Sequence, residues 1–585
     1  MAAINKLLIF LLVKVAVAFE PCNPIVYTQS GQIIGTYNIS RYGRSFASYR
    51  GIPYAQPPIG DLRFKEPVPV QPSSFPLDAT KEGPFCIQKN YLFNTHPLVE
   101  GQEDCLYLNV YAPILDSTIT FPLPVMVFIH WGALITGRGS SDILGPEYLM
   151  DKDVILVTFN YRLGPFGFLS TLDDEAPGNN GFKDQVLALK WVREHIANFG
   201  GDPNQVTIFG QSAGAGSVHL HILSEQSRGL FHRAISASGS ALSLWAKPFN
   251  DLQKTVTGVQ ATLVGCQNST GSSADLIKCL RNVPAETLAN SQDLFKIIGF
   301  DPLVVFSSVI EEKTDRNPNP FLTKQPLQYI QDGDFSNVPW ISGNVENEGI
   351  LRVSSLVRQK QQRSIFNANC TSLLPQMLVL TASVADVEGE LNNITQKYMQ
   401  GKCFADIHDP KSIKGLIDLY TDRSFAYGSY QTAMLHSAMG HSPIWHYNFN
   451  YKGQYTFGDL FAATNETVNF DWGVSHCDEL LYIFRSPALF PDITDPTDST
   501  MIDIMTEFWT NFAITGNPMA TKIFDWYPLN INSIKEMRNQ NFQHLSIEGT
   551  NYENTISLRM ENGFHKDRMR FWSRQSLLEN FDGLN

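Results

Sequence analysis

A serine flanked by small residues lies near the centre of the chain, in Gly210-Gln211-Ser212-Ala213-Gly214. The preceding residues, Val206 to Phe209, are mostly β-branched or aromatic and predict a buried strand. The following residues, Ala215 to Leu223, carry apolar side chains at helical spacing. A serine on a sharp strand-to-helix turn is presented to a substrate, and the helix N-terminus places a positive dipole where an oxyanion would form. The pattern therefore predicts a nucleophile for acyl transfer.

The same glycines have two other interpretations, a dinucleotide-binding turn and a packing turn. A dinucleotide site needs the spacing G-x-G-x-x-G, whereas Gly210, Gly214 and Gly216 give G-x-x-x-G-x-G. A glycine-rich packing turn stays open, but the strand on one side and the helix on the other favour the nucleophile.

A serine at its ordinary pKa is a poor nucleophile and needs a base and an acidic residue that orients the base. His476 is the candidate base, in a loop that precedes an apolar stretch. Glu346 and Glu348 are the candidate acids, because they follow the apolar run 338–341 and catalytic groups of α/β proteins collect at strand ends. The local pattern does not choose between the two. The order serine, acid, histidine is that of α/β-hydrolases.

Taken one at a time, these histidines and glutamates have simpler interpretations than catalysis. His219 and His221 lie on the predicted helix after the serine, where a base would point away from it. For His476 or either glutamate taken alone, an ordinary surface-loop role is the simpler interpretation. Their order with Ser212 is what favours catalysis.

The elements that must position these residues alternate along the chain. Short apolar runs at 124–129, 154–159 and 205–209 predict buried strands, and 183–199 has the periodicity of an amphipathic helix. Strand, helix and strand in succession predict βαβ units, hence an α/β fold with a mostly parallel sheet. A last helix is expected over 569–581, and the arginines at 568, 570 and 574 predict a solvated face.

Composition excludes several classes of protein. The 585 residues are 43% hydrophobic and 17% charged, unlike a disordered chain. The formal net charge of −13 argues against nucleic acid or an anionic membrane surface as a partner. No apolar run reaches the roughly 20 residues that a membrane span needs.

The N-terminus has the pattern of a secretory signal. An apolar run from Leu7 to Val13 is followed by the small residues Ala16-Val17-Ala18, so residues 1–18 are expected to be removed and the protein secreted. An oxidising compartment makes disulfides the default for the eight cysteines, none of which forms a C-x-x-C pair. Surface-loop glycosylation is expected at the N-x-S/T sites Asn38, Asn268, Asn369, Asn393 and Asn465.

Several longer stretches make the chain similar to the type-B carboxylesterase/cholinesterase family over nearly all its mature length. They are Tyr49-Arg50-Gly51-Ile52-Pro53-Tyr54-Ala55, Glu103-Asp104-Cys105-Leu106-Tyr107-Leu108-Asn109-Val110, Asn160-Tyr161-Arg162-Leu163-Gly164, Asn180-Gly181-Phe182-Lys183-Asp184-Gln185 and the serine pentapeptide. The resemblance implies an α/β-hydrolase fold, with a large, mostly parallel central sheet flanked by helices, as one domain over 19–585. It also implies a secreted serine esterase that needs no metal or cofactor.

The resemblance also assigns individual roles. The family's acid directly precedes a glycine, which selects Glu348. The implied disulfides are Cys86–Cys105 and Cys266–Cys279, whereas Cys22, Cys370, Cys403 and Cys477 receive no partner. Ser238 matches a serine near the acid, and Trp245 matches an acyl-pocket position.

The oxyanion loop departs from the family pattern. The implied N–H donors are Gly132, Ala133 and Ala213, but the loop reads His130-Trp131-Gly132-Ala133 where relatives carry His-Gly-Gly. Trp131 would shift the loop if its position requires a positive φ; the alternative is that its ring forms an aromatic wall at the pocket mouth. Loss of one oxyanion donor typically lowers kcat about 10²–10³-fold.

Within the family, the elbow Gln211 and the pattern G-x-x-H-x-x-D/E at Gly473, His476 and Glu479 resemble insect juvenile hormone esterases. Arg63-Phe64 and Asp184-Gln185 match motifs of the same group. Three hypotheses follow: hydrolysis of juvenile hormone methyl ester, a general secreted carboxylesterase for dietary, xenobiotic or odorant esters, and a non-catalytic adhesion or binding member. The first two need only a small apolar ester and water as partners.

Overall fold

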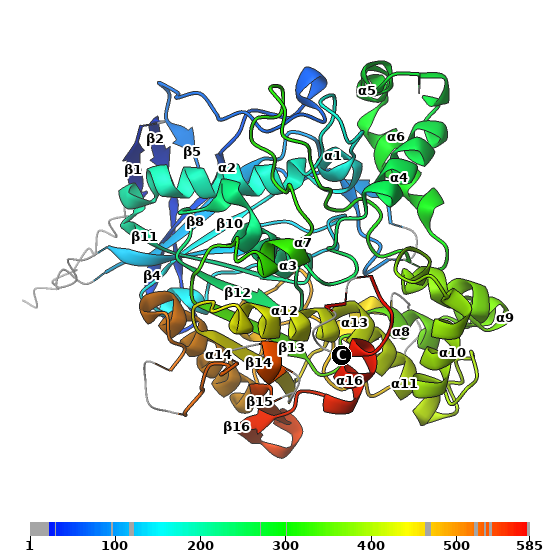
Figure 1. Cartoon of the computed structure of the whole chain (residues 1–585). Helices are drawn as coiled ribbons and strands as arrows, with labels where there is room; N and C mark the ends of the chain where they lie inside the picture. Colours follow the sequence, from blue (N-terminus) through cyan, green and yellow to red (C-terminus); the bar gives the residue numbers. More distant parts are fainter. Residues whose placement is uncertain are drawn as a thin grey trace, which may run out of the picture.

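An eleven-stranded mixed sheet forms the centre of the computed structural model (Figure 1). The structure describes residues 23–29, 31–94, 97–115, 122–269, 271–299, 301–462, 470–519, 524–531, 534–537, 541–578 and 580–581. Across the sheet the strands are β16 (Thr555–Asn562), β15 (Gln543–Thr550), β14 (Ile444–Lys452), β13 (Trp340–Val345), β12 (Arg233–Ala237), β11 (Gly201–Gln211), β9 (Leu123–Ile129), β10 (Ile155–Phe159), β8 (Tyr107–Pro113), β4 (Ser45–Pro53) and β3 (Thr36–Ile39).

The middle of this sheet is parallel and its two ends are antiparallel. Every pairing from β10 through β9, β11, β12, β13 and β14 to β15 is parallel, whereas β16 and the β8–β4–β3 end pair antiparallel. The predicted mostly parallel α/β sheet is therefore confirmed. Two small sheets accompany it: β1 (Ile25–Thr28), β2 (Gly31–Ile34) and β5 (Leu77–Asp78), and β6 (Gln88–Lys89) with β7 (Val99–Glu100).

Helices cover both faces of the sheet (Figure 1). Those that precede β13 along the chain are α1 (Gly164–Phe168), α2 (Asn180–His195), α3 (Ala213–Leu223), α4 (Asn250–Leu263), α5 (Ser273–Asn282), α6 (Ala285–Asn290) and α7 (Pro326–Gln331). The others are α8 (Ile350–Arg358), α9 (Lys360–Met377), α10 (Val387–Tyr398), α11 (Pro410–Thr421), α12 (Tyr427–Ala438), α13 (Phe457–Phe461), α14 (Pro496–Thr515), α15 (Ile534–Met537) and α16 (Lys566–Ser573).

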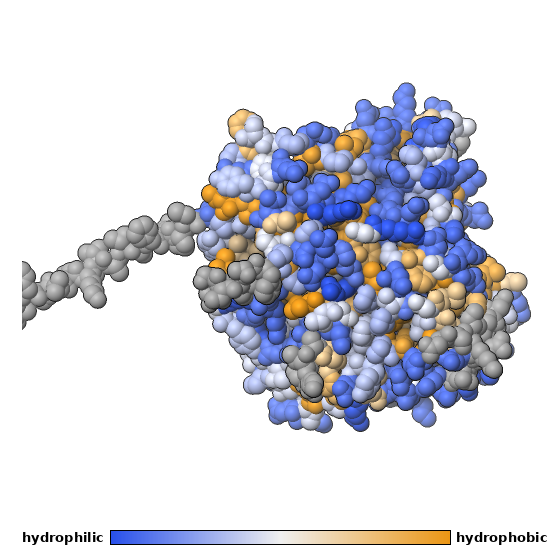
Figure 2. All heavy atoms as spheres, turned by 60° about the vertical axis from the view of Figure 1, so that its left-hand side comes forward, coloured by the Kyte–Doolittle hydropathy of each residue, from blue (hydrophilic) through white to orange (hydrophobic). Residues whose placement is uncertain are grey.

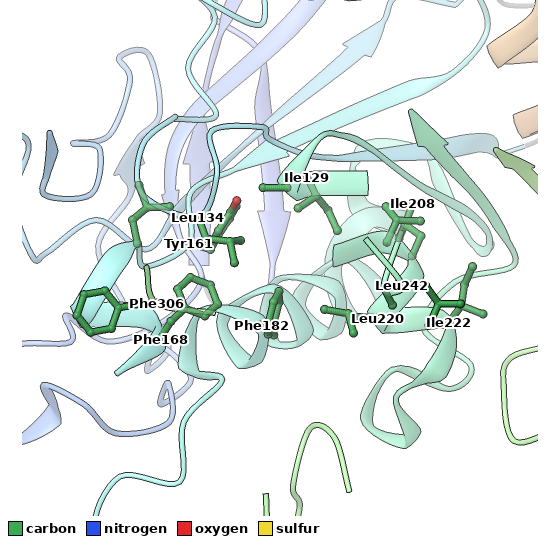
Figure 3. Close-up of a cluster of buried hydrophobic side chains, with 14 of the residues drawn as sticks. Ile129, Leu134, Tyr161, Phe168, Phe182, Ile208, Leu220, Ile222, Leu242 and Phe306 are labelled. Carbon is green, nitrogen blue, oxygen red and sulfur yellow. The ribbon is translucent and has the colours of Figure 1, made fainter. Parts of the chain in front are cut away.

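Alternation of side chains along the central strands builds two cores. Val127 and Ile208 belong to a core that includes α2 and α3, whereas their neighbours Phe128 and Phe209 belong to a second core with α14. Figure 3 shows the first core, in which strand residues lie among aromatic and aliphatic side chains of α2 and α3, such as Phe182. Strands buried on both faces read as continuous apolar runs, which is why they were recognisable in the sequence.

Two predicted element boundaries need correction. The strand expected at 205–209 is longer, Gly201–Gln211, and the terminal helix ends at Ser573 rather than at 581. The terminal arginines are not simply a solvated face either. Arg568 forms ion pairs with Asp418 at 2.8 Å and with the fully buried Asp422 at 2.7 Å.

Residues of two motifs that the family resemblance singled out form ion pairs, one of them fully buried. Arg162 Nη2 lies 2.6 Å from Asp184 Oδ1, and these side chains are 3% and 0% exposed. Arg63 donates from Nε and Nη2 to the two carboxylate oxygens of Glu103 at 2.6 and 2.5 Å. A bidentate pair fixes the relative orientation of the two segments. These residues therefore join distant segments of the scaffold.

The cysteines and glycosylation sites are placed as follows. Cys86–Cys105 and Cys266–Cys279 are bonded, a third disulfide joins Cys370 to Cys403, and Cys477 is a buried free thiol. Residues 1–18, Cys22 and Asn465 lie outside the described residues. The other four sequon asparagines are exposed, but on β3, on a 3-10 turn, on α9 and on α10 rather than in open loops.

The molecular surface is dominated by polar side chains in the view of Figure 2, with apolar residues scattered among them. Among the described helices, none has both the length and the apolar character needed to cross a membrane.

Buried histidines predict that the fold loses stability in mild acid. His446 is fully buried, its ring lies 4.8 and 5.0 Å from those of Phe542 and Phe564, and neither ring nitrogen has a partner among the described residues. Burial lowers the pKa of His446 well below 6.5 and that of His544 to about 4. The unfolded chain therefore takes up protons below pH 6.5 that the folded chain does not, so stability falls as pH falls.

We expect His446→Phe to remove one of these protons without loss of packing. The variant should lose about 2 kcal/mol less stability than the wild type between about pH 7.5 and about pH 5. Urea unfolding at the two pH values measures this, with His408→Phe, at an exposed histidine, as the control. An unchanged pH dependence in His446→Phe would contradict the assignment.

Candidate active site

The predicted nucleophile lies on a strained turn between β11 and α3. Ser212 has φ 57° and ψ −121° and is the N-cap of α3, and its N–H donates to Ala237 O on β12 at 2.8 Å. A Cβ on Gly214 would lie 2.0 Å from the carbonyl oxygen of Ile129 on β9, so only glycine lets the helix approach the sheet this closely. The small residues of the motif thus have the steric role expected of a nucleophile elbow.

Glu348 and His476 form a buried pair. Nδ1 of His476 lies 2.5 Å from Glu348 Oε2, and the side chains are 2% and 0% exposed. The other carboxylate oxygen, Oε1, accepts from Asn344 Nδ2 at 3.1 Å and from the N–H of Val345 at 3.0 Å. Glu348 is thereby held in one orientation, and its contact with Nδ1 favours the tautomer in which Nε2 of His476 is the acceptor.

The structure separates the two glutamates that local sequence could not. Glu346 accepts from Asn448 Nδ2 at 2.8 Å and lies 3.5 Å from His565, whereas Glu348 contacts His476. Burial and local contacts explain His219 and His221 without a catalytic role. His219 Nε2 lies 2.9 Å from His436 Nε2, and burial lowers the pKa of both His219 and His221 to about 3.

The segments carrying acid, base and serine contact one another. Asn347 and Ser475 form a parallel bridge, and the N–H of Asn347 donates to Val474 O at 3.2 Å. Gln211, the chain neighbour of Ser212, places its amide nitrogen 3.4 Å from Nε2 and 3.5 Å from Nδ1 of His476. Among the described residues the Ser212 hydroxyl forms no hydrogen bond with His476. In substrate-free sites this contact is often long and shortens only when a substrate is bound.

Trp131 does not occupy a strained position in the predicted oxyanion loop. Gly132 has φ 119° and Ala133 has φ 56°, whereas Trp131 is absent from the positive-φ residues of the described chain. A Cβ on Gly132 would lie 2.0 Å from Thr136 O, so this position requires glycine and the Trp131 position does not. Within the described segments, the N–H groups of Gly132, Ala133 and Ala213 donate to no protein acceptor, as oxyanion donors must before substrate binds.

Trp131 instead forms part of an aromatic wall. Its ring lies 5.6 Å from that of Phe93 and 5.9 Å from that of Phe457, and it is 4% exposed. Phe461 extends the wall to the imidazole of His476, at 6.3 Å. The second interpretation of Trp131, as an aromatic wall, agrees with this packing. Such a wall favours binding of an apolar group of a ligand.

Phe425 is a site residue that the sequence did not reveal. Its ring lies 4.5 Å from the imidazole of His476 and 5.9 Å from the indole of Trp245. Phe425 stands in a long helical stretch, where an apolar side chain is most simply a core residue. Only its position beside His476, 51 residues further along the chain, distinguishes it.

Ser238, Glu479 and Cys477 form the surroundings of the acid and base. Ser238 Oγ donates to Glu479 Oε1 at 3.5 Å, a weak contact, and the N–H of Ser238 donates to Gly343 O on β13 at 2.8 Å. Ser238 therefore contacts Glu479 rather than Glu348. The thiol of Cys477 donates to Gln211 Oε1 at 3.2 Å, and burial raises the pKa of this thiol, which keeps it protonated.

Known proteins resemble this chain over nearly its full length. A sequence profile described as "Carboxylesterase family" matches residues 22–572. "Juvenile hormone esterase" of Tribolium castaneum is 53% identical over 96% of both chains, and "Venom carboxylesterase-6" of Apis mellifera is 34% identical over 95% of both. The crystal structure of juvenile hormone esterase from Manduca sexta, with OTFP covalently attached, is 31% identical with a TM-score of 0.80, covering 94% of this chain and 99% of that one.

Fold and comparisons together define a serine carboxylesterase with an α/β-hydrolase fold. The chain belongs to the carboxylesterase family and is a carboxylic ester hydrolase, which sets aside the non-catalytic hypothesis.

The oxyanion loop yields a test with two neighbouring substitutions. Gly132→Ala should lower kcat for a small ester about 100-fold or more, because the added methyl displaces the loop and with it an oxyanion donor. Trp131→Gly should retain kcat for the same ester within about 10-fold, because that position does not need glycine, while KM rises for esters with long apolar chains. Steady-state kinetics of both purified variants, with circular dichroism to verify folding, would decide this. Equal losses of kcat in the two variants would contradict the assignment.

Proposed function

We propose that Ser212, His476 and Glu348 are the catalytic nucleophile, base and acid of this esterase. His476 Nε2 takes the proton of the Ser212 hydroxyl as the oxygen attacks the ester carbonyl, and Glu348 stabilises the resulting imidazolium without taking its proton. The N–H groups of Gly132, Ala133 and Ala213 stabilise the tetrahedral oxyanion. The 2.5 Å contact between His476 and Glu348 supports these roles.

The second half of the cycle uses the same groups. His476 gives its proton to the leaving alcohol, which departs and leaves Ser212 as an acyl ester. Water then loses a proton to His476 as it attacks the acyl carbonyl, and collapse of the second tetrahedral intermediate releases the acid and restores the Ser212 hydroxyl. The proposed two-step reaction thus uses only these residues, the ester and water.

The physiological substrate proposed is juvenile hormone, a conjugated methyl ester with a long apolar acyl chain. The observation that carries this assignment is the 53% identity with "Juvenile hormone esterase" of Tribolium castaneum over 96% of both chains. The aromatic wall of Phe93, Trp131, Phe457 and Phe461 suits an apolar chain. A conjugated carbonyl is a weak electrophile, so the oxyanion donors must be well placed.

Secretion belongs to the same proposal. The signal pattern at residues 1–18 directs the chain to an oxidising compartment, and three disulfides among the described cysteines are stable there. Removal of the signal would leave residues 19–585 as a single enzyme domain.

A substrate panel tests the proposal. The measurement is kcat/KM for juvenile hormone beside 1-naphthyl acetate, with Ser212→Ala as the blank. We expect a strong preference for the hormone and loss of both activities in Ser212→Ala by at least about 10³-fold, the scale of removing a triad member. Labelling by a fluorophosphonate should likewise disappear in Ser212→Ala.

The outcomes separate the remaining hypotheses. Fast hydrolysis of the naphthyl ester with little hormone turnover would make the protein a general carboxylesterase, which the similarity to "Venom carboxylesterase-6" also allows. A well-folded wild type that hydrolyses neither ester and is not labelled would overturn the proposed nucleophile.

A further inference from the structure

The helical stretch between α11 and α12 contains one turn of π-helix. The turn spans Asp422–Ala426, all five residues are buried, and the N–H of Tyr427 donates to Asp422 O, five residues back. A π-turn accommodates an extra residue in a helix at a cost in hydrogen-bond geometry, and such turns occur frequently at functional sites. This one lies between two regular helices of twelve residues each, so the distortion is local.

The π-turn contacts the proposed base directly. Phe425 is 1% exposed, and its ring lies 4.5 Å from the imidazole of His476 with 39° between the ring planes. Gln211 contacts the same imidazole, with its amide nitrogen 3.4 Å from Nε2 and 3.5 Å from Nδ1. The imidazole is thus held by packing as well as by its hydrogen bond to Glu348.

The same turn also contacts the acid segment and the acyl-pocket tryptophan. The carbonyl of Ser424 accepts the indole N–H of Trp245 at 2.7 Å. One residue before the turn, Thr421 Oγ1 accepts the N–H of Gly349, the neighbour of Glu348, at 2.9 Å. Six consecutive residues, 421–426, therefore contact the base, the acid segment and the acyl side of the site.

The first residue of the turn, Asp422, is bonded to α10 and to the C-terminal helix α16. Asp422 accepts from Tyr398 Oη at 2.7 Å and from Arg568 Nε of α16 at 3.0 Å. Burial raises the pKa of Asp422 to about 6, whereas the cation of Arg568 lowers it, so Arg568 is the counter-ion that lets this carboxylate stay ionised. Asp418 also pairs with Arg568, at 2.8 Å.

We infer that the π-helical turn Asp422–Ala426 is the positioning element of the base, with Phe425 as the residue that holds the imidazole of His476 and the Asp422–Arg568 pair as its anchor. The inference rests on the proposed roles of Ser212, His476 and Glu348, and does not depend on which ester is physiological. It makes α16, which lies outside the site, a determinant of turnover. The effect should appear in kcat rather than in KM, because a displaced base impairs chemistry and not ester binding.

The first test is Phe425→Leu, assayed with 1-naphthyl acetate and with a long-chain naphthyl ester. We expect kcat to fall about 10–100-fold for both esters, the scale of a small misplacement of a catalytic group, with KM for the acetate within about 3-fold. The matched control is Phe512→Leu on α14, the same change in the same apolar core, with its ring against Trp445 instead of His476. The control should lose comparable thermal stability and keep its kcat.

Two results would overturn the inference from this first test. A rise in KM confined to the long-chain ester, with unchanged kcat for the acetate, would make Phe425 a pocket wall only. Equal kcat in Phe425→Leu and Phe512→Leu would make it a core residue only. Failure of the proposed nucleophile is distinguished separately, because the fluorophosphonate must label the wild type and not Ser212→Ala.

The second test addresses the anchor. Arg568→Lys and the milder Tyr398→Phe each remove part of the support of Asp422 and should lower kcat for 1-naphthyl acetate about 3–10-fold without changing KM. The control is Arg559→Lys, at a pair with Glu548 on the exposed side of β16, where the guanidinium side chain is 62% exposed. Combining Arg568→Lys with Phe425→Leu should cost less than the product of the two single losses, because both act on one contact. Fully multiplicative losses, or unchanged kcat in folded Arg568→Lys and Tyr398→Phe, would refute the anchor.

Discussion

The close approach of α3 to the sheet is the constraint on which the site depends. Ser212 adopts φ 57° and ψ −121°, a backbone conformation that residues with a Cβ rarely take. Such a conformation persists only when several surrounding contacts hold it in place. Here the surroundings do so on both sides of the turn. The N–H of Ser212 is bonded to Ala237 on β12, and Gly214 lies against the carbonyl of Ile129 on β9. Two parallel neighbours of β11 thus hold the strained serine in place.

Parallel strands also explain why the other groups meet there. The carboxyl ends of β9, β11 and β13 lie at one edge of the sheet, and they lead to the oxyanion loop, to Ser212 and to Glu348. His476 comes from a segment that follows β14 and is joined to the acid segment by the Asn347–Ser475 bridge. The arrangement needs no unusual residue types, only a sheet whose parallel order brings these ends together.

Much of this organisation is legible in the sequence because it follows short-range rules. Strands buried on both faces give continuous apolar runs, and the elbow needs glycines at fixed offsets from its serine, so both have local signatures. Glu348 could not be separated from Glu346 locally, because the difference between them is the direction of the side chain at the end of β13. Family resemblance supplied that choice.

Other features leave no local trace. The Cys370–Cys403 pair joins cysteines 33 residues apart among several equivalent candidates. Phe425 reads as an ordinary apolar helix residue, and Arg568 reads as a solvated one, since a partner such as Asp422 lies 146 residues away. What the sequence could not give in these cases is a contact between distant segments, whereas each residue type by itself is unremarkable.

Two buried glutamates near the site differ in their hydrogen-bond partners. Glu348 and Glu479 are both fully buried, but Glu348 accepts three hydrogen bonds, including that of His476. Glu479 accepts the weak 3.5 Å contact from Ser238 at Oε1, and its Oε2 has no partner among the described residues. Burial and the nearby Glu348 carboxyl raise the pKa of Glu479 well above its usual value, which favours its protonated form.

The thiol and the amide beside the imidazole of His476 are neutral groups. Burial and the nearby acidic groups raise the pKa of the Cys477 thiol as well, and Gln211 carries no charge, so Glu348 is the carboxylate that directly faces the imidazole. Two glutamates with different hydrogen-bond partners thus have different environments, which is how one site can separate the behaviour of identical side chains. In the mechanism proposed above, the imidazolium formed during acyl transfer is stabilised through Nδ1, on the Glu348 side, and its Nε2 proton is directed at the serine and the leaving alcohol.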